Sequence, residues 1–170
     1  MKNRIDTRRL TVLSSLIAVA MILSYIESLI PIFVSVPGVK VGLSNIATVF
    51  ALYTLGAPSA VCVTLVRVFL SALLFGNVST LMFSLGGAAL ALCAMILLKR
   101  VKIFSAIGVS TAGAVMHNAG QTIVACFLLE NAAISIYIVP LTISGTVAGV
   151  VIGIAAGLLT EKLEGHLRLK

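Results

Sequence analysis

Apolar residues fall into about six long runs that occupy most of this 170-residue chain. A run of about 20 apolar residues is what a helix needs to cross the ~30 Å hydrocarbon core of a bilayer. The chain is 60% hydrophobic and 10% charged, whereas a soluble domain carries roughly 25% charged residues. The sequence therefore predicts an all-α integral membrane protein, a six-transmembrane-helix bundle formed by one membrane domain over residues 1–170.

Proline and glycine mark the boundaries of the predicted helices. The stretch "LGAPSA" joins the second and third helices in a tight hairpin, where Pro58 suits a helix start. Pro31, Pro37 and Gly38 exclude a continuous helix and predict an outer cover loop over residues 31–40. After a cytoplasmic tail at 1–9, the helices are expected at 10–30, 41–57, 58–76, 79–98, 103–129 and 133–160.

The positive charges indicate orientation in a membrane. The chain has 12 Lys and Arg against 5 Asp and Glu. Six spans place both termini on one side, and ten of the 12 cations then share that side. By the positive-inside rule this side is the cytoplasm. We therefore expect both termini in the cytoplasm, a multi-pass protein of a bacterial plasma membrane, and no nucleic-acid partner. The two remaining cations are Lys40 and Arg67.

Arg67 lies in the middle of the apolar run "CVTLVRVFLSALLFG", residues 62–76. A guanidinium at the centre of a bilayer costs about 2.5–3.5 kcal/mol on insertion scales. In "GAVMHNAGQ", His117 and Gln121 are spaced to share one helix face, and Asn118 lies beside that face. Polar groups in lipid must face protein or a cavity. We therefore expect Arg67 and this face to point at each other inside the bundle.

These residues predict an internal site for an anion. Arginine suits bidentate recognition of phosphate or carboxylate, and three helix N-termini are expected at the outer mouth. The ligand is expected to be a small anionic, partly apolar molecule that is admitted from the outer side. The candidate substrate-binding residues are Arg67, Lys40, Asn45, His117, Asn118, Gln121 and Glu27.

Each candidate also has a structural reading. Lys40 could simply snorkel, with its ammonium group at the outer membrane interface. Asn118 and Gln121 could join helices by hydrogen bonds. His117 could be a neutral core histidine, and Glu27 could be only a counter-ion for Arg67. Small residues spaced four apart, among them Gly145 through Gly157, predict tight helix packing.

Five stretches carry a resemblance to a known family. In order, "ESLIP", "PGVKVGLSNI", "LVRVFL", "SLGG" and "GVSTAGAVMHNAGQ" resemble the family called heptaprenyl diphosphate synthase component I, also known as the Gx transporter family. Six short helices, cytoplasmic termini and a cover loop after the first helix are similar to the S component of energy-coupling factor (ECF) transporters. In S components a small-xxx-small motif on the first helix docks onto the coupling subunit. By resemblance this role falls to Ser14 and Ala18.

The resemblance implies a substrate-binding membrane subunit of an ECF-type transporter, with membrane lipid, a coupling subunit and ATPases as partners. The ligand would be an isoprenoid, a quinone precursor or a flavin-like molecule. Two alternatives stay open. One is a non-catalytic membrane subunit of heptaprenyl diphosphate or menaquinone side-chain synthesis. The other is a scaffold in a membrane flavin or electron-transfer assembly.

The residues argue against an enzyme despite the family's name. Prenyl diphosphate synthases hold Mg²⁺-diphosphate through paired Asp-rich motifs, but Asp6, in the predicted tail, is the one aspartate of this chain. The chain has no G-x-x-x-x-G-K-[ST] motif for ATP. Its three cysteines fall within predicted helices without metal-ligand spacing. We therefore expect no catalytic residues, no metal and no cofactor.

Overall fold

The computed structural model describes residues 7–29 and 42–167, and the chain is helical through nearly all of these ranges without any strand. The predicted all-α class is therefore confirmed. The elements are α1 (Thr7–Leu29), α2 (Asn45–Thr54), α3 (Ala57–Phe75), α4 (Val78–Val101), α5 (Ala106–Leu128), the 3₁₀ helix η1 (Ala132–Tyr137) and α6 (Ile138–Leu167).

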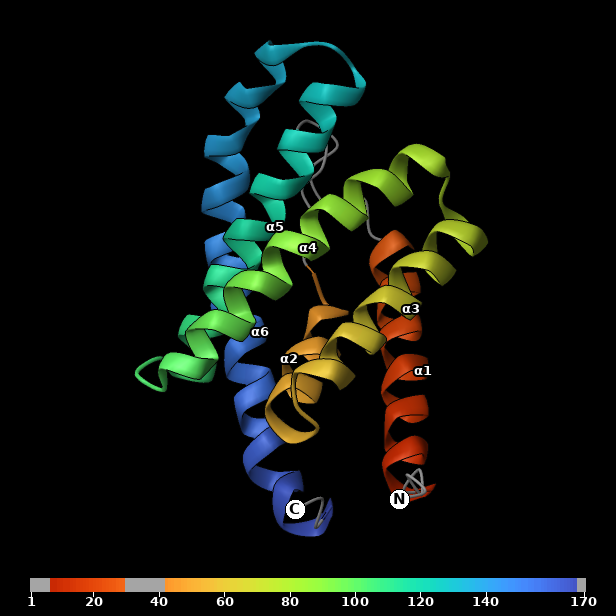
Figure 1. Cartoon of the computed structure of the whole chain (residues 1–170), viewed down its shortest axis with the longest axis vertical. Coiled ribbons are helices and arrows are strands. Elements are labelled where there is room, and N and C mark those ends of the chain that lie inside the picture. Colours follow the sequence, from red (N-terminus) through yellow and green to blue (C-terminus); the bar gives the residue numbers. More distant parts are fainter. Residues whose placement is uncertain (1–6, 30–41, 168–170) are drawn as a thin grey trace, which may run out of the picture.

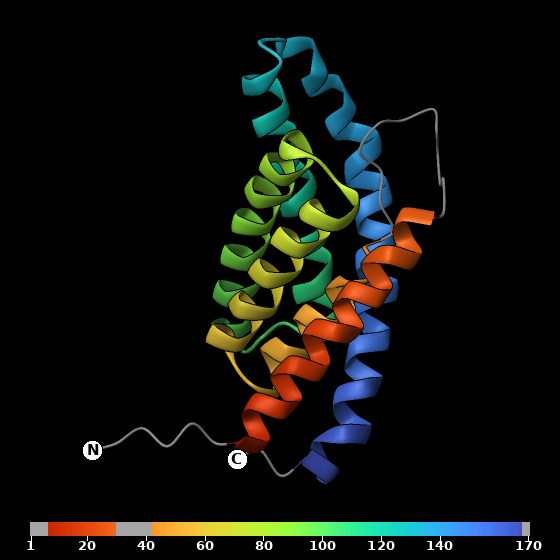
Figure 2. The same ribbon diagram turned by 90° about the vertical axis from the view of Figure 1, so that its right-hand side faces the viewer.

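Successive helices alternate in direction, so that α1 begins and α6 ends at the same end of the bundle (Figure 1). Helix α5 packs between α4 and α6, while α1 and α2 both pack on α3. Helix α2 also contacts α6 and so joins the two groups of helices. In Figure 2 α1 crosses in front of α6, but Figure 1 shows the two helices apart, with α2 between them.

Four helical stretches in the described ranges are long and apolar enough to cross a membrane: Thr7–Leu29, Ala57–Phe75, Val78–Val101 and Ala132–Leu163. The expected number of helices is present, but α2 has ten residues instead of the span expected over 41–57. At 1.5 Å per residue α2 rises only about 15 Å, half of the ~30 Å hydrocarbon core. Helix α5 has 23 residues but is not among the four stretches. The lengths and compositions of the helices therefore support four membrane spans and do not confirm the predicted six.

Two glycines limit α2 to this short length. Gly42 (φ 74°) and Gly56 (φ 91°) both adopt left-handed backbone conformations, which favour glycine over other residues. Gly42 O accepts the Asn45 N–H at 2.8 Å in the turn that leads into α2, and Gly56 N donates to Ala51 O at its end. The next helix then begins at Ala57, with Pro58 in its first turn, as the sequence indicates.

The core forms around α2, which is buried from Ala47 to Leu52. Its apolar side chains meet buried residues of α3, α5 and α6, among them Val63, Val109 and Ile152. In α1, by contrast, only Ala20 and Ser24 are buried. Large apolar side chains remain exposed on the outer faces of the helices. Apolar outer faces around a packed centre suit a protein that is surrounded by lipid.

Glycine contacts hold α4, α5 and α6 close together. A Cβ atom on Gly120 would lie 2.9 Å from the Cα of Gly87, and one on Gly149 would lie 2.6 Å from the Cα of Thr111. Real Cβ atoms do not approach so closely, so these positions accept only glycine at the observed spacing. The predicted small-residue packing is confirmed for the α5–α6 contact, where Gly145, Gly149 and Gly153 face α5.

Two cations from other helices bind the C-terminal end of α2. Arg9 Nη2 donates to Leu55 O at 3.0 Å and to Ser59 Oγ at 3.2 Å. Lys99 Nζ donates to Leu52 O and lies 5.0 Å from the centroid of the Tyr53 ring. Helix C-termini leave carbonyls unpaired and carry partial negative charge, which favours cations there. In the sequence, Arg9 and Lys99 indicate only the orientation of the chain in the membrane, whereas the structure gives both a second role.

Candidate functional site

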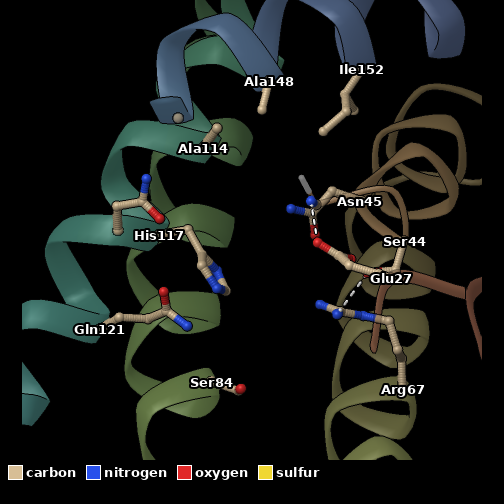
Figure 3. A pocket seen from close by; sticks show the side chains of 13 residues that line it. Glu27, Ser44, Asn45, Arg67, Ser84, Ala114, His117, Gln121, Ala148 and Ile152 are labelled. Carbon is tan, nitrogen blue, oxygen red and sulfur yellow. Dashed lines mark hydrogen bonds between the residues drawn. The ribbon is translucent and has the colours of Figure 1, made fainter. Parts of the chain in front are cut away.

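A cavity of about 60 Å³ lies where α2, α3, α4, α5, α6 and the end of α1 meet (Figure 3). Arg67 and Glu27 lie on one side of it, and His117 and Gln121 lie on the other. The structure thus brings together residues from opposite ends of the sequence. The polar residues that line the cavity are Glu27, Ser44, Asn45, Arg67, Ser84, His117, Asn118 and Gln121.

Arg67 reaches this cavity because α3 buries the neighbouring side chains Val63, Thr64 and Val68 against the bundle. Its Nη1 donates a hydrogen bond of 2.9 Å to Ser44 Oγ, at the start of α2. Its Nε is buried and has no hydrogen-bond partner among the described residues. The guanidinium therefore enters the interior with a hydrogen bond to Ser44, and with an Nε–H that is covered by the protein and has no acceptor among the described residues.

Ser44 was not predicted as a site residue. It is 1% exposed and directly precedes α2, where its side chain bonds to Arg67 instead of capping its own helix. The one signal in the sequence was its position in "GLSNI", in front of a helix start, which usually indicates a cap. That pattern does not reveal a contact with a residue 23 positions later.

Glu27 lies beside Arg67, as expected, and the two charges attract one another. The hydrogen bond that its Oε1 accepts comes from the backbone N–H of Gly42. Glu27 therefore also joins the end of α1 to the turn before α2. Arg67 donates a hydrogen bond to Ser44, while Glu27 acts on the guanidinium through its charge.

The predicted face of α5 does point into the cavity. His117 and Gln121 are directed toward Arg67 in Figure 3, and Gln121 is 9% exposed. Asn118 also lines the cavity, but its Nδ2 donates to Leu141 O at 2.6 Å. That bond joins α5 to α6, which is the structural role that sequence analysis left open for Asn118.

The remaining candidates lie elsewhere. Asn45 is the first residue of α2, not one turn into it, and it lines the cavity. Lys40 lies outside the described residues. Ser14 and Ala18 are exposed on α1 and lie away from the cavity. The predicted docking positions are thus separate from the predicted binding positions.

A second cavity, of about 150 Å³, adjoins the first on the α1 side of Arg67. Glu27, Arg67 and Ser84 line both, and Ser24, Ser28 and Ser71 add hydroxyl groups to the second. The described residues form no group of three or more His, Cys, Asp or Glu that could hold a metal ion. A guanidinium, an imidazole, amides and hydroxyls are instead the donors that bind phosphate or carboxylate.

The helices are mostly apolar, and four helical stretches of the described residues are long enough to span a membrane. The cavity inside them is lined by charged and polar side chains. These features define a multi-pass membrane protein with an internal polar site. The chain belongs to the family described as heptaprenyl diphosphate synthase component I, whose family model matches residues 16–159. This confirms the family resemblance seen in the sequence. No curated protein and no solved structure matches the chain.

Proposed function

We propose that this protein is the substrate-binding membrane subunit of an ECF-type transporter, and that it binds a small anionic, partly apolar molecule beside Arg67. The observation that carries the proposal is the Arg67 side chain, which lines two cavities inside the bundle and whose buried Nε has no hydrogen-bond partner among the described residues. A buried donor without a partner costs about 1–3 kcal/mol. An anion beside Arg67 would accept from the N–H groups of the guanidinium and offset part of the cost of burying its charge.

The surrounding residues favour an anion over a cation. Among the described residues that line the two cavities, Glu27 is the one carboxylate, and its Oε1 already accepts from Gly42 N. Gln121 and Ser84 offer further donors from the opposite wall, where the His117 side chain also lies. Charged residues inside membrane proteins commonly mark the path or site of a substrate.

The transport role rests on the resemblance to S components, with one supporting observation. Ser14 and Ala18 are exposed on α1, which buries only two of its residues in the bundle. This small-residue face is therefore open to a coupling subunit. Such a subunit, with its ATPases, would supply the energy for which this chain has no ATP-binding motif.

A second candidate function follows from the family. Heptaprenyl diphosphate synthase component I is the family's description, and a prenyl diphosphate is an anion with an apolar chain. In this role the protein would hold a prenyl diphosphate for a separate catalytic subunit. The charged cavity suits both functions. They differ in the protein partner, which is a coupling subunit with ATPases in the first and a catalytic synthase subunit in the second.

Native mass spectrometry of the protein purified from its membrane in mild detergent tests the proposal. We expect an anionic small molecule to be retained by the wild-type protein and by Arg100→Met, which removes an exposed arginine at the end of α4. The Arg67→Met variant should lose it. Retention by Arg67→Met would contradict the proposal. Co-purification of ATPases, as opposed to a prenyl synthase, separates the two functions.

A further inference from the structure

A third cavity, of about 390 Å³, adjoins the polar site at the end of the bundle farthest from both termini. It lies between the start of α4, the end of α5, η1 and the start of α6. Its polar residues Thr80, Ser84, Gln121 and Thr122 come from the first turns of α4 and the middle of α5. The remainder is lined by Phe83, Ala125, Leu129, Ile134 and Leu141, together with Tyr137, whose ring carries a hydroxyl.

The helix packing explains this cavity. Gly86 and Gly120 bring the backbones of α4 and α5 into contact near the middle of the two helices. From there α4 and α5 diverge toward the end that carries η1 (Figure 1). Helix η1 and the start of α6 then form the remaining wall. The space is therefore a consequence of the helix crossing.

The three cavities meet at Ser84, which lines all of them, and Gln121 lines both the smallest and the largest. Small-molecule sites usually have volumes of about 300–1,000 Å³. The cavity of about 60 Å³ beside Arg67 is too small to hold such a ligand by itself. A ligand with its charged group at Arg67 has two directions in which to extend. One is the cavity of about 150 Å³ on the α1 side. The other leads past Ser84 and Gln121 into the apolar cavity, which is the larger and less polar of the two.

We infer that the apolar cavity between α4, α5, η1 and α6 is the subsite for the hydrocarbon chain of the ligand whose anionic group binds Arg67. This inference rests on the proposed function and specifies its substrate class: a linear amphiphile with a phosphate or carboxylate at one end. Gln121 and Ser84 lie at the junction of head and chain. In this arrangement Arg67 binds the anionic group, and the apolar wall makes the affinity depend on the length of the hydrocarbon chain.

The affinities of four probes for the protein in lipid nanodiscs test this subsite: inorganic diphosphate and the dimethylallyl, geranyl and farnesyl diphosphates. Affinity should rise at least about tenfold with each isoprene unit that enters the apolar cavity, because each buried methylene adds favourable transfer free energy. Equal affinity for all four would overturn the subsite and leave the proposed anion site standing. Binding of none of them would contradict the proposed function itself.

Ala125→Phe places a ring in the apolar cavity without touching Arg67. It should weaken farnesyl diphosphate at least about tenfold, since overpacking excludes the chain, and leave inorganic diphosphate unchanged. Ala125→Leu, with a smaller side chain, should show a smaller loss and serves if the phenylalanine variant does not fold. Unchanged farnesyl affinity in a folded variant would overturn the subsite. So would native mass spectra in which a bilayer phospholipid stays bound in the presence of farnesyl diphosphate.

Discussion

Arg67 Nη1 and Ser44 Oγ lie 2.9 Å apart, and this hydrogen bond joins the middle of α3 to the start of α2. The bond holds the guanidinium at the wall of the cavity and leaves its Nε without a protein partner among the described residues. The nearby Glu27 carboxylate also attracts the guanidinium, but this hydrogen bond of Arg67 goes to a neutral hydroxyl, which binds a cation less strongly than an anionic ligand would.

Replacing Arg67 should separate binding from folding. Arg67→Lys keeps the charge but loses the planar fork, so ligand affinity should fall if recognition is bidentate. Arg67→Met removes the cost of burying a charge but leaves Glu27 and Ser44 without this partner. The thermal unfolding temperature should therefore stay within roughly a few degrees of the wild-type value, because the two effects oppose each other, and binding should be abolished. Ligand affinity and unfolding temperature are measured on both variants. A Met variant that still binds would show that the anion has another partner.

Ser44→Ala removes the hydroxyl that accepts from Arg67. The free energy of unfolding should fall by about 1–3 kcal/mol, because a buried charged donor loses its partner. Ligand affinity should fall as well, since the guanidinium is no longer held in place. Ser135→Ala is the matched control, because Ser135 is exposed and its hydroxyl bonds only to Ala132 O nearby. An equal loss of stability in both variants would contradict the role of Ser44.

Lys99→Met removes one of the two cations at the end of α2. Since Lys99 bonds to Leu52 O and lies against Tyr53, we expect a loss of about 1–2 kcal/mol in unfolding free energy. Thermal unfolding followed by circular dichroism measures the loss. Arg100→Met alters the adjacent exposed cation and should change stability little.

Gly120→Ala tests the contact between α4 and α5. The added methyl would meet the backbone of Gly86 and Gly87, so stability should fall by about 1–3 kcal/mol. Gln121, the next residue, should shift and ligand affinity should drop. In Gly108→Ala the new Cβ would be 3.5 Å from Phe104 Cδ1, an ordinary contact. That control should be neutral or up to about 1 kcal/mol more stable, because alanine favours helix.

Ala18→Leu adds bulk to the exposed face of α1. If a coupling subunit docks there, the variant should lose co-purification with that subunit while its ligand affinity stays unchanged. Thr146→Leu makes a comparable change on the exposed face of α6 and should keep the complex. A complex that survives Ala18→Leu would place the docking face elsewhere.

The sequence alone was enough to predict the helical class, the membrane environment and the family. These properties depend on local composition and on the length of apolar runs. It also indicated Arg67, since a charge in such a run is conspicuous, and it placed His117 and Gln121 on one face by helical spacing. The true length of α2 was missed because its boundaries depend on the conformations of Gly42 and Gly56, which an apolar pattern does not encode.

Tertiary structure decided which partner each polar group received. Ser44 binds Arg67 across 23 positions, and Lys99 binds the carbonyl of Leu52 across 47. Contacts of this kind arise only when helices cross at a particular angle and separation, which the glycine contacts among α4, α5 and α6 help to set. The cavities have the same origin, because the space between diverging helices depends on how they pack and not on any single segment.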